Sequence, residues 1–198
     1  MLIYTPDSYS ESSPSGKRAL FLDRDGVINR EINYLHKIED FEFIDGIFDL
    51  CRTAVEHNYR VVVVTNQSGI ARGYYSEADL EKLTKWMMRE FAGHGIEISR
   101  VYACPHLINA DLESYRRDCH ARKPNPGMLL QAKEDFNLDL SKCIFIGDKK
   151  RDMEAGLRAG IGSLILFDAS GSVPEDLDLK VSIVSNLNQL KEKLLREK

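Results

Sequence analysis

An apolar run that ends in two acidic residues is the feature of this sequence that most constrains the fold. Residues 19–22 read Ala-Leu-Phe-Leu, and Asp23, Arg24, Asp25 and Gly26 follow directly. Such a segment is typical of a strand that helices cover on both faces. The acids then lie at the carboxyl end of the strand, where open α/β sheets bind ligands. Because side chains alternate along a strand, Asp23 and Asp25 are expected to point to the same side and to favour a cation.

Strand and helix patterns alternate along the rest of the chain. The expected strands after the first span residues 60–65, 98–104, 143–146, 163–167 and 181–184. Apolar stripes at helical spacing predict helices between them, over residues 45–57, 77–93, 127–136 and 153–159, with a last helix from residue 187. This alternation predicts an α/β fold with a doubly wound parallel sheet.

The length of the chain suits one domain. Its 198 residues, 43% of them hydrophobic, can bury the core of a single α/β domain. Residues 1–16 are rich in Ser, Pro and Glu, so we expect a flexible tail there. The domain itself is then expected to span residues 17–198.

Composition narrows the classes of partner. The chain has 27 basic and 31 acidic residues and a net charge of -4, which disfavours nucleic acid. No apolar stretch reaches the roughly 18 residues that span a bilayer, and the N-terminus lacks the pattern of a secretory signal. We expect a cytoplasmic monomer that acts on a small molecule. The 4 cysteines do not predict a disulfide scaffold in a chain of this length.

Polar residues also follow two other apolar strands and precede one helix. Thr65 ends the second strand, Asp148 and Asp152 follow the fourth, and Lys123 precedes a helix. If these strands are neighbours, the carboxylates share one crevice, and their oxygens suit Mg²⁺. A metal, a Thr hydroxyl and a Lys ammonium can together stabilise a phosphoryl group. The pattern predicts phosphoryl transfer, with an aspartate as nucleophile and Asp25 moving protons.

Four motifs in a fixed order resemble the haloacid dehalogenase (HAD) superfamily of phosphatases. They are D-x-D-G after a strand, a strand ending in Thr, Lys before a helix, and G-D-x-x-x-D after another strand. The resemblance implies a Rossmann-like fold and an aspartyl-phosphate intermediate. Asp23 would be the nucleophile and Asp25 the general acid and base, while Thr65 and Lys123 would stabilise the phosphoryl group. The implied Mg²⁺ ligands are Asp23, the backbone carbonyl of Asp25, and Asp148, with Asp152 supporting Lys123 or the metal shell.

Longer segments resemble the D-glycero-D-manno-heptose-1,7-bisphosphate 7-phosphatases within that superfamily. The similarity covers nearly the whole chain from Arg18 and includes residues 22–26, 65–73, 104–106, 122–128 and 147–149. It implies removal of the 7-phosphate of the heptose bisphosphate in lipopolysaccharide precursor synthesis. The implied substrate contacts are Glu31, Ile32, Asn33, Tyr34, Asn66, Gln67, Ser68, Arg122 and Lys149.

The spacing of the motifs leaves too few residues for a separate cap domain. An open site cannot enclose its substrate, so we expect specificity to rest on a few loop contacts.

Alternative functions differ from this hypothesis in particular residues. Histidinol-phosphatases are similar in several of these segments but resemble T-N-Q-D-G, where this chain has Ser68. A catalytically silent binding module of the same fold is the alternative from another class, although the catalytic residues are all present. Dehalogenase activity is disfavoured because the second carboxylate, Asp25, suits phosphoryl hydrolysis.

The loop at residues 104–121, the Cys/His loop, suggests a structural Zn²⁺ site. Zn²⁺ in such sites takes four nitrogen or sulfur ligands in a tetrahedron. The family pattern has a further cysteine where this chain has Ala121, and His120 is the nearby substitute. The alternatives are three protein ligands completed by water, or a loop without metal. The candidate ligands are Cys104, His106, Cys119 and His120.

Overall fold

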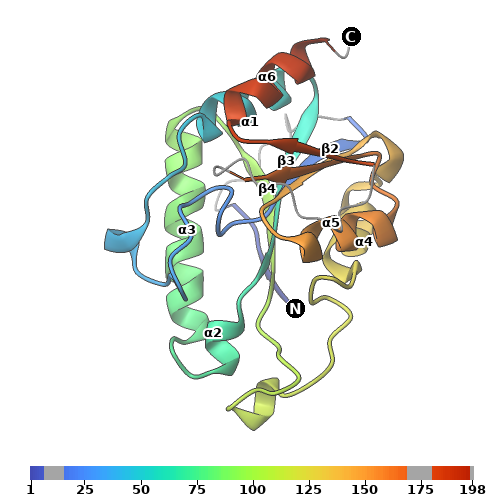
Figure 1. Cartoon of the computed structure of the whole chain (residues 1–198). Coiled ribbons are helices and arrows are strands. Elements are labelled where there is room, and N and C mark those ends of the chain that lie inside the picture. The colour runs from blue at the N-terminus through green and yellow to red at the C-terminus, as the bar shows by residue number, and fades with distance from the viewer. Residues whose placement is uncertain (7–15, 169–179, 197–198) are drawn as a thin grey trace.

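A computed structural model describes residues 1–6, 16–168 and 180–196, and these residues form a seven-stranded sheet. The strand order is β1-β4-β3-β2-β5-β6-β7 (Figure 1). All neighbouring strands pair in parallel except β1, which is antiparallel to β4. The strands are β1 (Leu2–Tyr4), β2 (Arg18–Leu22), β3 (Tyr59–Asn66), β4 (Ile98–Cys104), β5 (Ile144–Gly147), β6 (Ser163–Phe167) and β7 (Val181–Val184).

Helices cover both faces of this sheet. Residues of α1, α3 and α6 pack in one apolar cluster, and residues of α4 and α5 pack in a second. Figure 1 shows α3 on one side of the sheet and α4 and α5 on the other. The helices are α1 (Ile47–Glu56), α2 (Ser68–Ala71), α3 (Glu77–Gly93), α4 (Gly127–Phe136), α5 (Lys150–Ala159) and α6 (Leu187–Arg196).

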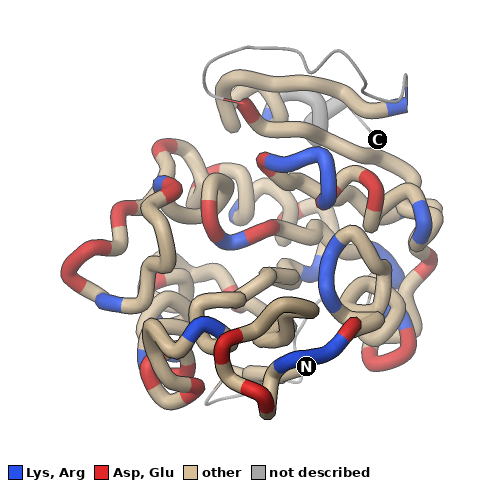
Figure 2. Tube along the Cα trace, turned by 60° about the horizontal axis from the view of Figure 1, so that its bottom comes forward, with Lys and Arg blue, Asp and Glu red and all other residues tan. Residues whose placement is uncertain are grey.

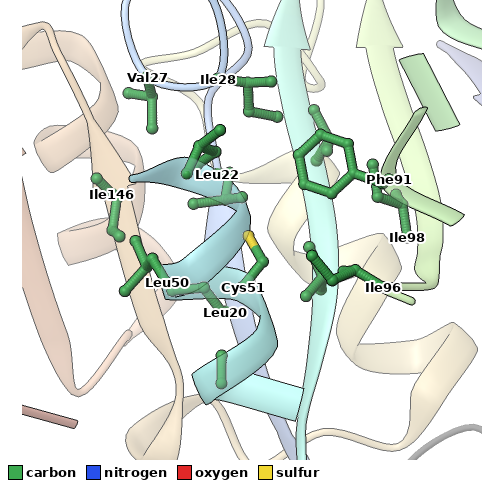
Figure 3. Packing of buried hydrophobic residues seen from close by; sticks show 14 of the residues in the cluster. Leu20, Leu22, Val27, Ile28, Leu50, Cys51, Phe91, Ile96, Ile98 and Ile146 are labelled. Atoms are coloured by element: carbon green, nitrogen blue, oxygen red, sulfur yellow. The ribbon is translucent and has the colours of Figure 1, made fainter. Parts of the chain in front are cut away.

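Alternating side chains of the central strand supply both cores. Leu20 and Leu22 of β2 pack with Leu50 of α1, on the face seen in Figure 3. Ala19 and Phe21 point the other way and join the second cluster. Because both faces of β2 are buried, its sequence is continuously apolar up to Asp23. This burial holds the two acids rigidly at the strand end.

The expected elements agree closely with the described ones. Strands Ile98–Cys104, Ser163–Phe167 and Val181–Val184 and helix Gly127–Phe136 have the predicted bounds. Ser76 caps α3, because its hydroxyl accepts from the backbone of Asp79 while the Asp79 carboxylate accepts from the backbone of Ser76. Sequence reasoning missed the short helix α2.

The expectation of a flexible tail is wrong for the first residues. Leu2–Tyr4 form β1, with Leu2 opposite Ala103 of β4. Leu2 and Tyr4 pack against buried residues that include Ile70 and Leu80, so apolar contacts and strand pairing order this segment. Residues 7–15, the Ser-rich part of the expected tail, lie outside the described residues.

The surface carries both signs of charge. Figure 2 shows acidic and basic residues interspersed along the same segments of the trace. None of the helices among the described residues is long and apolar enough to cross a membrane.

Candidate active site

Three neighbouring strands bring the predicted catalytic residues to one edge of the sheet. Asp23 and Asp25 follow β2, Thr65 is the second-last residue of β3, and Asp148 follows β5. Because β2 lies between β3 and β5, their carboxyl ends are adjacent. The pairing extends past β2, since the backbone N–H of Asp23 donates to the carbonyl of Ile146 at 3.0 Å.

Lys123 is the buried cation of this edge. Its ammonium lies 2.9 Å from Asp23 Oδ2 and 2.7 Å from Asp152 Oδ1, and donates to the carbonyl of Val64 at 2.9 Å. Burial alone would lower the pKa of Lys123, but Asp152 and Asp23 outweigh it and raise the pKa above its ordinary value. The side chain therefore stays charged.

Asn66 holds the backbone of Lys123 in place. Its Nδ2 donates to the Lys123 carbonyl at 3.0 Å, and its Oδ1 accepts from the Lys123 N–H at 3.1 Å. These two bonds join β3 to a segment 57 residues later in the chain, next to the cis peptide between Lys123 and Pro124. Asn66, which the sequence suggested as a substrate contact, thus also positions Lys123.

Three carboxylates form a group that fits a divalent cation. Oxygen atoms of Asp23, Asp148 and Asp152 lie within 4.8 Å of one another. Asp148 Oδ1 is buried without a hydrogen-bond partner, whereas its Oδ2 lies 2.8 Å from the Lys149 ammonium. Asp152 uses one oxygen for Lys123 and accepts from the backbone of Lys149 at 3.0 Å with the other. Asp23 and Asp148 are therefore better placed as ligands than Asp152, which orients Lys123.

Burial and crowding disfavour the charged forms of these acids. Burial raises the pKa of Asp23 to about 7, helped by Asp152 and Asp148 and opposed by Lys123. Burial likewise raises the pKa of Asp148 to about 6, although Lys149 opposes the shift. Hard oxygen donors crowded in this way suit Mg²⁺. The side chain of Asp25 is not in this group.

Several side chains donate hydrogen bonds to the Asp25 carboxylate. Arg24, which is 1% exposed, donates to Asp25 Oδ1 from Nε at 3.1 Å and to both carboxylate oxygens from Nη2. Asn29 donates to Oδ1 at 3.1 Å, and Gln67 donates to Oδ2 at 2.9 Å. The carboxylate is thus fixed, while 21% of the side chain remains exposed. A group held this way can exchange a proton with a bound substrate without moving.

A cavity of about 190 Å³ opens above these acids. The loop after β2 and the segment after β3 line it, as the resemblance implied. Lys149 and Arg122 are not among the lining residues: Lys149 lies 3.4 Å from Glu31, which does line the cavity, and Arg122 donates to the carbonyl of His106 at 3.1 Å. The lining residues are Asp23, Asp25, Glu31, Ile32, Asn33, Tyr34, Asn66, Gln67, Ser68, Gly69, Tyr75 and Arg151.

The Cys/His loop brings three of the four candidate zinc ligands together. Ligand atoms of Cys104, His106 and Cys119 lie within 4.8 Å of one another, and His106 Nδ1 is 3.1 Å from Cys119 Sγ. Two thiols and an imidazole are donors that Zn²⁺ takes. His120 is exposed and is not part of the group, so the expected Cys₂His₂ set is wrong in its fourth member. The side chain of His120 turns outward, and the buried Ala121 offers no donor.

Comparison with known proteins identifies the family. Residues 120–183 match a family model described as HAD-hydrolase-like. A D-glycero-alpha-D-manno-heptose-1,7-bisphosphate 7-phosphatase from Campylobacter jejuni is 55% identical over 151 residues, which are 76% of this chain and 83% of that protein. This chain belongs to the heptose-bisphosphate 7-phosphatase family. A family member from Escherichia coli K12, a D-glycero-beta-D-manno-heptose-1,7-bisphosphate 7-phosphatase, is 45% identical over 75% of this chain and 78% of its own length.

Solved structures of the family and of related phosphatases share the fold. D,D-heptose 1,7-bisphosphate phosphatase from B. bronchiseptica, complexed with magnesium and phosphate, has a TM-score of 0.75 and 29% identity, covering 91% of this chain and 99% of that one. A HAD-like phosphatase from Mesorhizobium loti has a TM-score of 0.82 and 32% identity, covering 97% of this chain and 92% of that one. These likenesses confirm the predicted doubly wound α/β fold.

Several residues of the site were not predicted from the sequence. Arg24 and Asn29 bind the Asp25 carboxylate, Tyr75 reaches Gln67, and Arg151 lines the cavity. Only Arg24 left a signal, because a charged residue inside the D-x-D motif, next to a buried strand, needs a partner. The other contacts depend on how distant segments meet.

Proposed function

We propose that this protein is a Mg²⁺-dependent phosphatase that removes the 7-phosphate of D-glycero-D-manno-heptose 1,7-bisphosphate. The observation that carries the proposal is the pairing of Asp23 with Lys123 beside the separately held Asp25. The Asp23 carboxylate lies against the buried ammonium of Lys123. The Asp25 carboxylate instead accepts hydrogen bonds from neutral and cationic side chains. Two aspartates with such different surroundings suit two different roles, a nucleophile and a proton carrier.

The first half of the reaction forms an aspartyl-phosphate. An oxygen of Asp23 attacks phosphorus, and the bond between phosphorus and the sugar oxygen breaks. Asp25, in its protonated form, gives its proton to the leaving oxygen. Lys123 and the Thr65 hydroxyl bind the phosphoryl oxygens as charge moves onto them.

The second half reverses the proton flow. Asp25, now a carboxylate, takes a proton from water, and the water oxygen attacks phosphorus of the aspartyl-phosphate. The bond between phosphorus and Asp23 breaks, which releases phosphate and restores the nucleophile. Bound Mg²⁺, held by Asp23, Asp148 and the carbonyl of Asp25, would supply positive charge that offsets the phosphate and the clustered acids.

The loops around the cavity support a phosphorylated sugar as substrate. Glu31 and Asn33 offer polar groups for hydroxyls at the mouth, and Arg151 brings a cation to the wall. Because the cavity is small and open, most of a bisphosphate would contact these loops rather than a closed pocket. The names and identities of the relatives support the choice of a heptose bisphosphate.

A substrate panel tests this proposal. We expect Mg²⁺-dependent release of one phosphate from heptose 1,7-bisphosphate, with kcat/KM at least about 100-fold above that for histidinol phosphate. The relatives named for the α anomer are 55% and 50% identical, against 45% for the E. coli relative named for the β anomer, so we expect the α anomer to react faster. Preferential turnover of histidinol phosphate would overturn the substrate assignment.

The Asp23→Asn variant separates enzyme from binding module. We expect it to lose about 1,000-fold or more in kcat, because an amide does not attack phosphorus. If the wild type released no phosphate from any ester tested, the catalytically silent alternative would stand instead.

We also propose that the Cys/His loop holds a structural Zn²⁺ through Cys104, His106 and Cys119. Burial raises the pKa of Cys104 to about 11, so its thiol needs a metal to become a thiolate ligand near neutral pH. Arg122 directly follows the loop, and its guanidinium donates to the carbonyl of His106 within it. Metal in the loop would therefore help to fix Arg122.

A further inference from the structure

Tyr75 lies behind the candidate active site and contacts it through the side chain of Gln67. The residue is 7% exposed, and its hydroxyl donates to Gln67 Oε1 at 2.5 Å. The ring stacks on His36, with centroids 5.1 Å apart and planes 11° from parallel. On the other side it contacts Gly69, where an added Cβ would lie 2.1 Å from the Tyr75 ring. Tyr75 thus fills a slot that only a glycine at position 69 leaves open.

The Tyr75 hydroxyl and the Asp25 carboxylate together fix which way the Gln67 amide faces. An amide group has an oxygen that only accepts and a nitrogen that only donates, and a carboxylate only accepts. Nε2 therefore donates to Asp25 Oδ2 at 2.9 Å and to Thr65 Oγ1 at 2.8 Å, while Oε1 on the opposite side accepts from Tyr75. Gln67 is 2% exposed, so water does not compete strongly for these bonds.

This direction matters at both catalytic residues. At Thr65 the amide fills an acceptor position of Oγ1, which leaves the hydroxyl proton to be donated to a phosphoryl oxygen. At Asp25 the amide holds the carboxylate toward the cavity, together with Arg24 and Asn29. A flipped amide would place Oε1 against the Asp25 carboxylate, where two acceptors repel each other.

We propose that Tyr75 is a positioning residue of the phosphatase, whose hydroxyl orients Gln67 so that its amide donates to Asp25 and Thr65. The inference rests on the proposed function, because it assigns Asp25 and Thr65 their catalytic roles. Tyr75 acts on the reaction only through Gln67 and does not touch the reacting atoms.

The Tyr75 hydroxyl keeps its proton under ordinary assay conditions. Burial raises the pKa of Tyr75 to about 12, with Asp25 adding to the shift and Arg24 opposing it. The phenol is therefore protonated throughout the pH range in which the enzyme can be assayed.

Removal of one hydroxyl tests the inference. We expect Tyr75→Phe to lower kcat about 5- to 20-fold with little change in KM, because the loss falls on the transition state. Tyr102→Phe is the matched control, since Tyr102 is also buried and its hydroxyl donates at 2.7 Å to Asp135, in the last turn of α4. The control is expected to lose similar stability and to keep kcat within about twofold.

A double-mutant cycle shows whether Tyr75 acts through Gln67. Gln67→Leu keeps the Tyr75 ring and removes the amide, so a second change, Tyr75→Phe, is then expected to alter kcat by less than about twofold. An equal loss in both backgrounds would contradict the inference, as would an unchanged kcat in the Tyr75→Phe single variant.

Two phosphate esters separate this inference from the proposed function. p-Nitrophenyl phosphate has a leaving group that needs little protonation, whereas heptose 1,7-bisphosphate releases an alkoxide that does. Tyr75→Phe is expected to lower kcat more for the sugar ester, because Asp25 must protonate that oxygen. If the wild type hydrolyses neither ester with Mg²⁺, the proposed function fails. If it hydrolyses them and Tyr75→Phe matches the Tyr102→Phe control on both, only the role of Tyr75 fails.

Discussion

The ammonium of Lys123 lies 2.9 Å from the Asp23 carboxylate and 2.7 Å from that of Asp152. One buried cation therefore lies between two buried acids, and Asp23 pairs with a residue 100 positions later in the chain. Removal of the cation leaves two acids repelling each other in a buried site, which is more damaging than the loss of one contact.

Replacement of Lys123 is expected to harm both activity and stability. We predict that Lys123→Met lowers kcat for p-nitrophenyl phosphate at least about 100-fold and lowers the free energy of unfolding by about 2–4 kcal/mol. Lys142→Met is the control, since Lys142 is 66% exposed and lies 3.3 Å from Asp139 at the surface. Steady-state kinetics and urea unfolding measure the two effects. A Lys123→Met enzyme with near wild-type kcat would show that the pair has no catalytic part.

The raised pKa of Asp148 predicts a pH-dependent stability of the metal-free protein. Its pKa rises from 3.8 to about 6 on folding, so the folded state binds more protons than the unfolded state between these values. Stability from this group is thus present at low pH and is lost as pH rises through about 6. In EDTA at pH 8, Asp148→Asn is expected to raise the free energy of unfolding by about 1–3 kcal/mol, and to have little effect at pH 4.

Urea unfolding at the two pH values, with and without Mg²⁺, measures this effect. Asp111→Asn, a change at an exposed acid, is the control. Mg²⁺ should stabilise the wild type and not Asp148→Asn, because the variant lacks a ligand. The assignment of Asp148 is wrong if both proteins gain equally from Mg²⁺.

Gly26 is expected to be required for the shape of the metal site. Its φ is +86°, and a Cβ there would lie 2.2 Å from Asp148 Oδ2, so Gly26→Ala must displace the Asp148 carboxylate. We predict at least about a 10-fold weaker apparent Mg²⁺ affinity in the phosphatase assay. Gly95→Ala has a similar backbone cost, at φ +75°, but nothing lies within 4 Å of its Cβ.

The two glycine variants separate the effect of backbone strain from the effect of a steric clash with Asp148. Both are expected to lose about 1 kcal/mol from the positive φ. Only Gly26→Ala should also change the dependence of activity on Mg²⁺. Equal Mg²⁺ titrations for the two variants would rule out the proposed contact between Gly26 and Asp148.

A fourth ligand is predicted to strengthen the zinc site. Ala121 is 8% exposed and lies two residues after Cys119, at the position where the family pattern has a further cysteine, so Ala121→Cys would supply a fourth donor. We expect Zn²⁺ affinity to rise at least about 100-fold in Ala121→Cys and to fall in Cys119→Ser. Competition with a chromogenic chelator measures both. Equal affinity in all three proteins, or no zinc in any of them, would count against the site.

The strands and the acidic motif could be predicted from local pattern alone. Residues 19–22 are apolar on both faces of β2, and Asp23 stands at the point where the apolar run ends. The same reasoning located Thr65 and Asp148, because each follows a short apolar run. Order of the motifs then indicated the chemistry. Composition gave a wrong prediction of a flexible tail at Leu2–Tyr4. These residues pair with β4 and pack against buried apolar side chains, although the residues that follow are polar.

Only the tertiary structure decided which of these residues meet. Asn66 binds the backbone of Lys123, 57 residues away, and Gln67 binds Asp25, 42 residues away. It also excluded His120 from the cysteine group, although His120 is adjacent to Cys119 in sequence. Local periodicity indicates on which face of its own strand or helix a side chain lies. A hydrogen bond between distant residues depends instead on the order of strands in the sheet. The sequence by itself therefore determined the elements and the reactive groups, and the packing of β2 between β3 and β5 decided how those groups form a site.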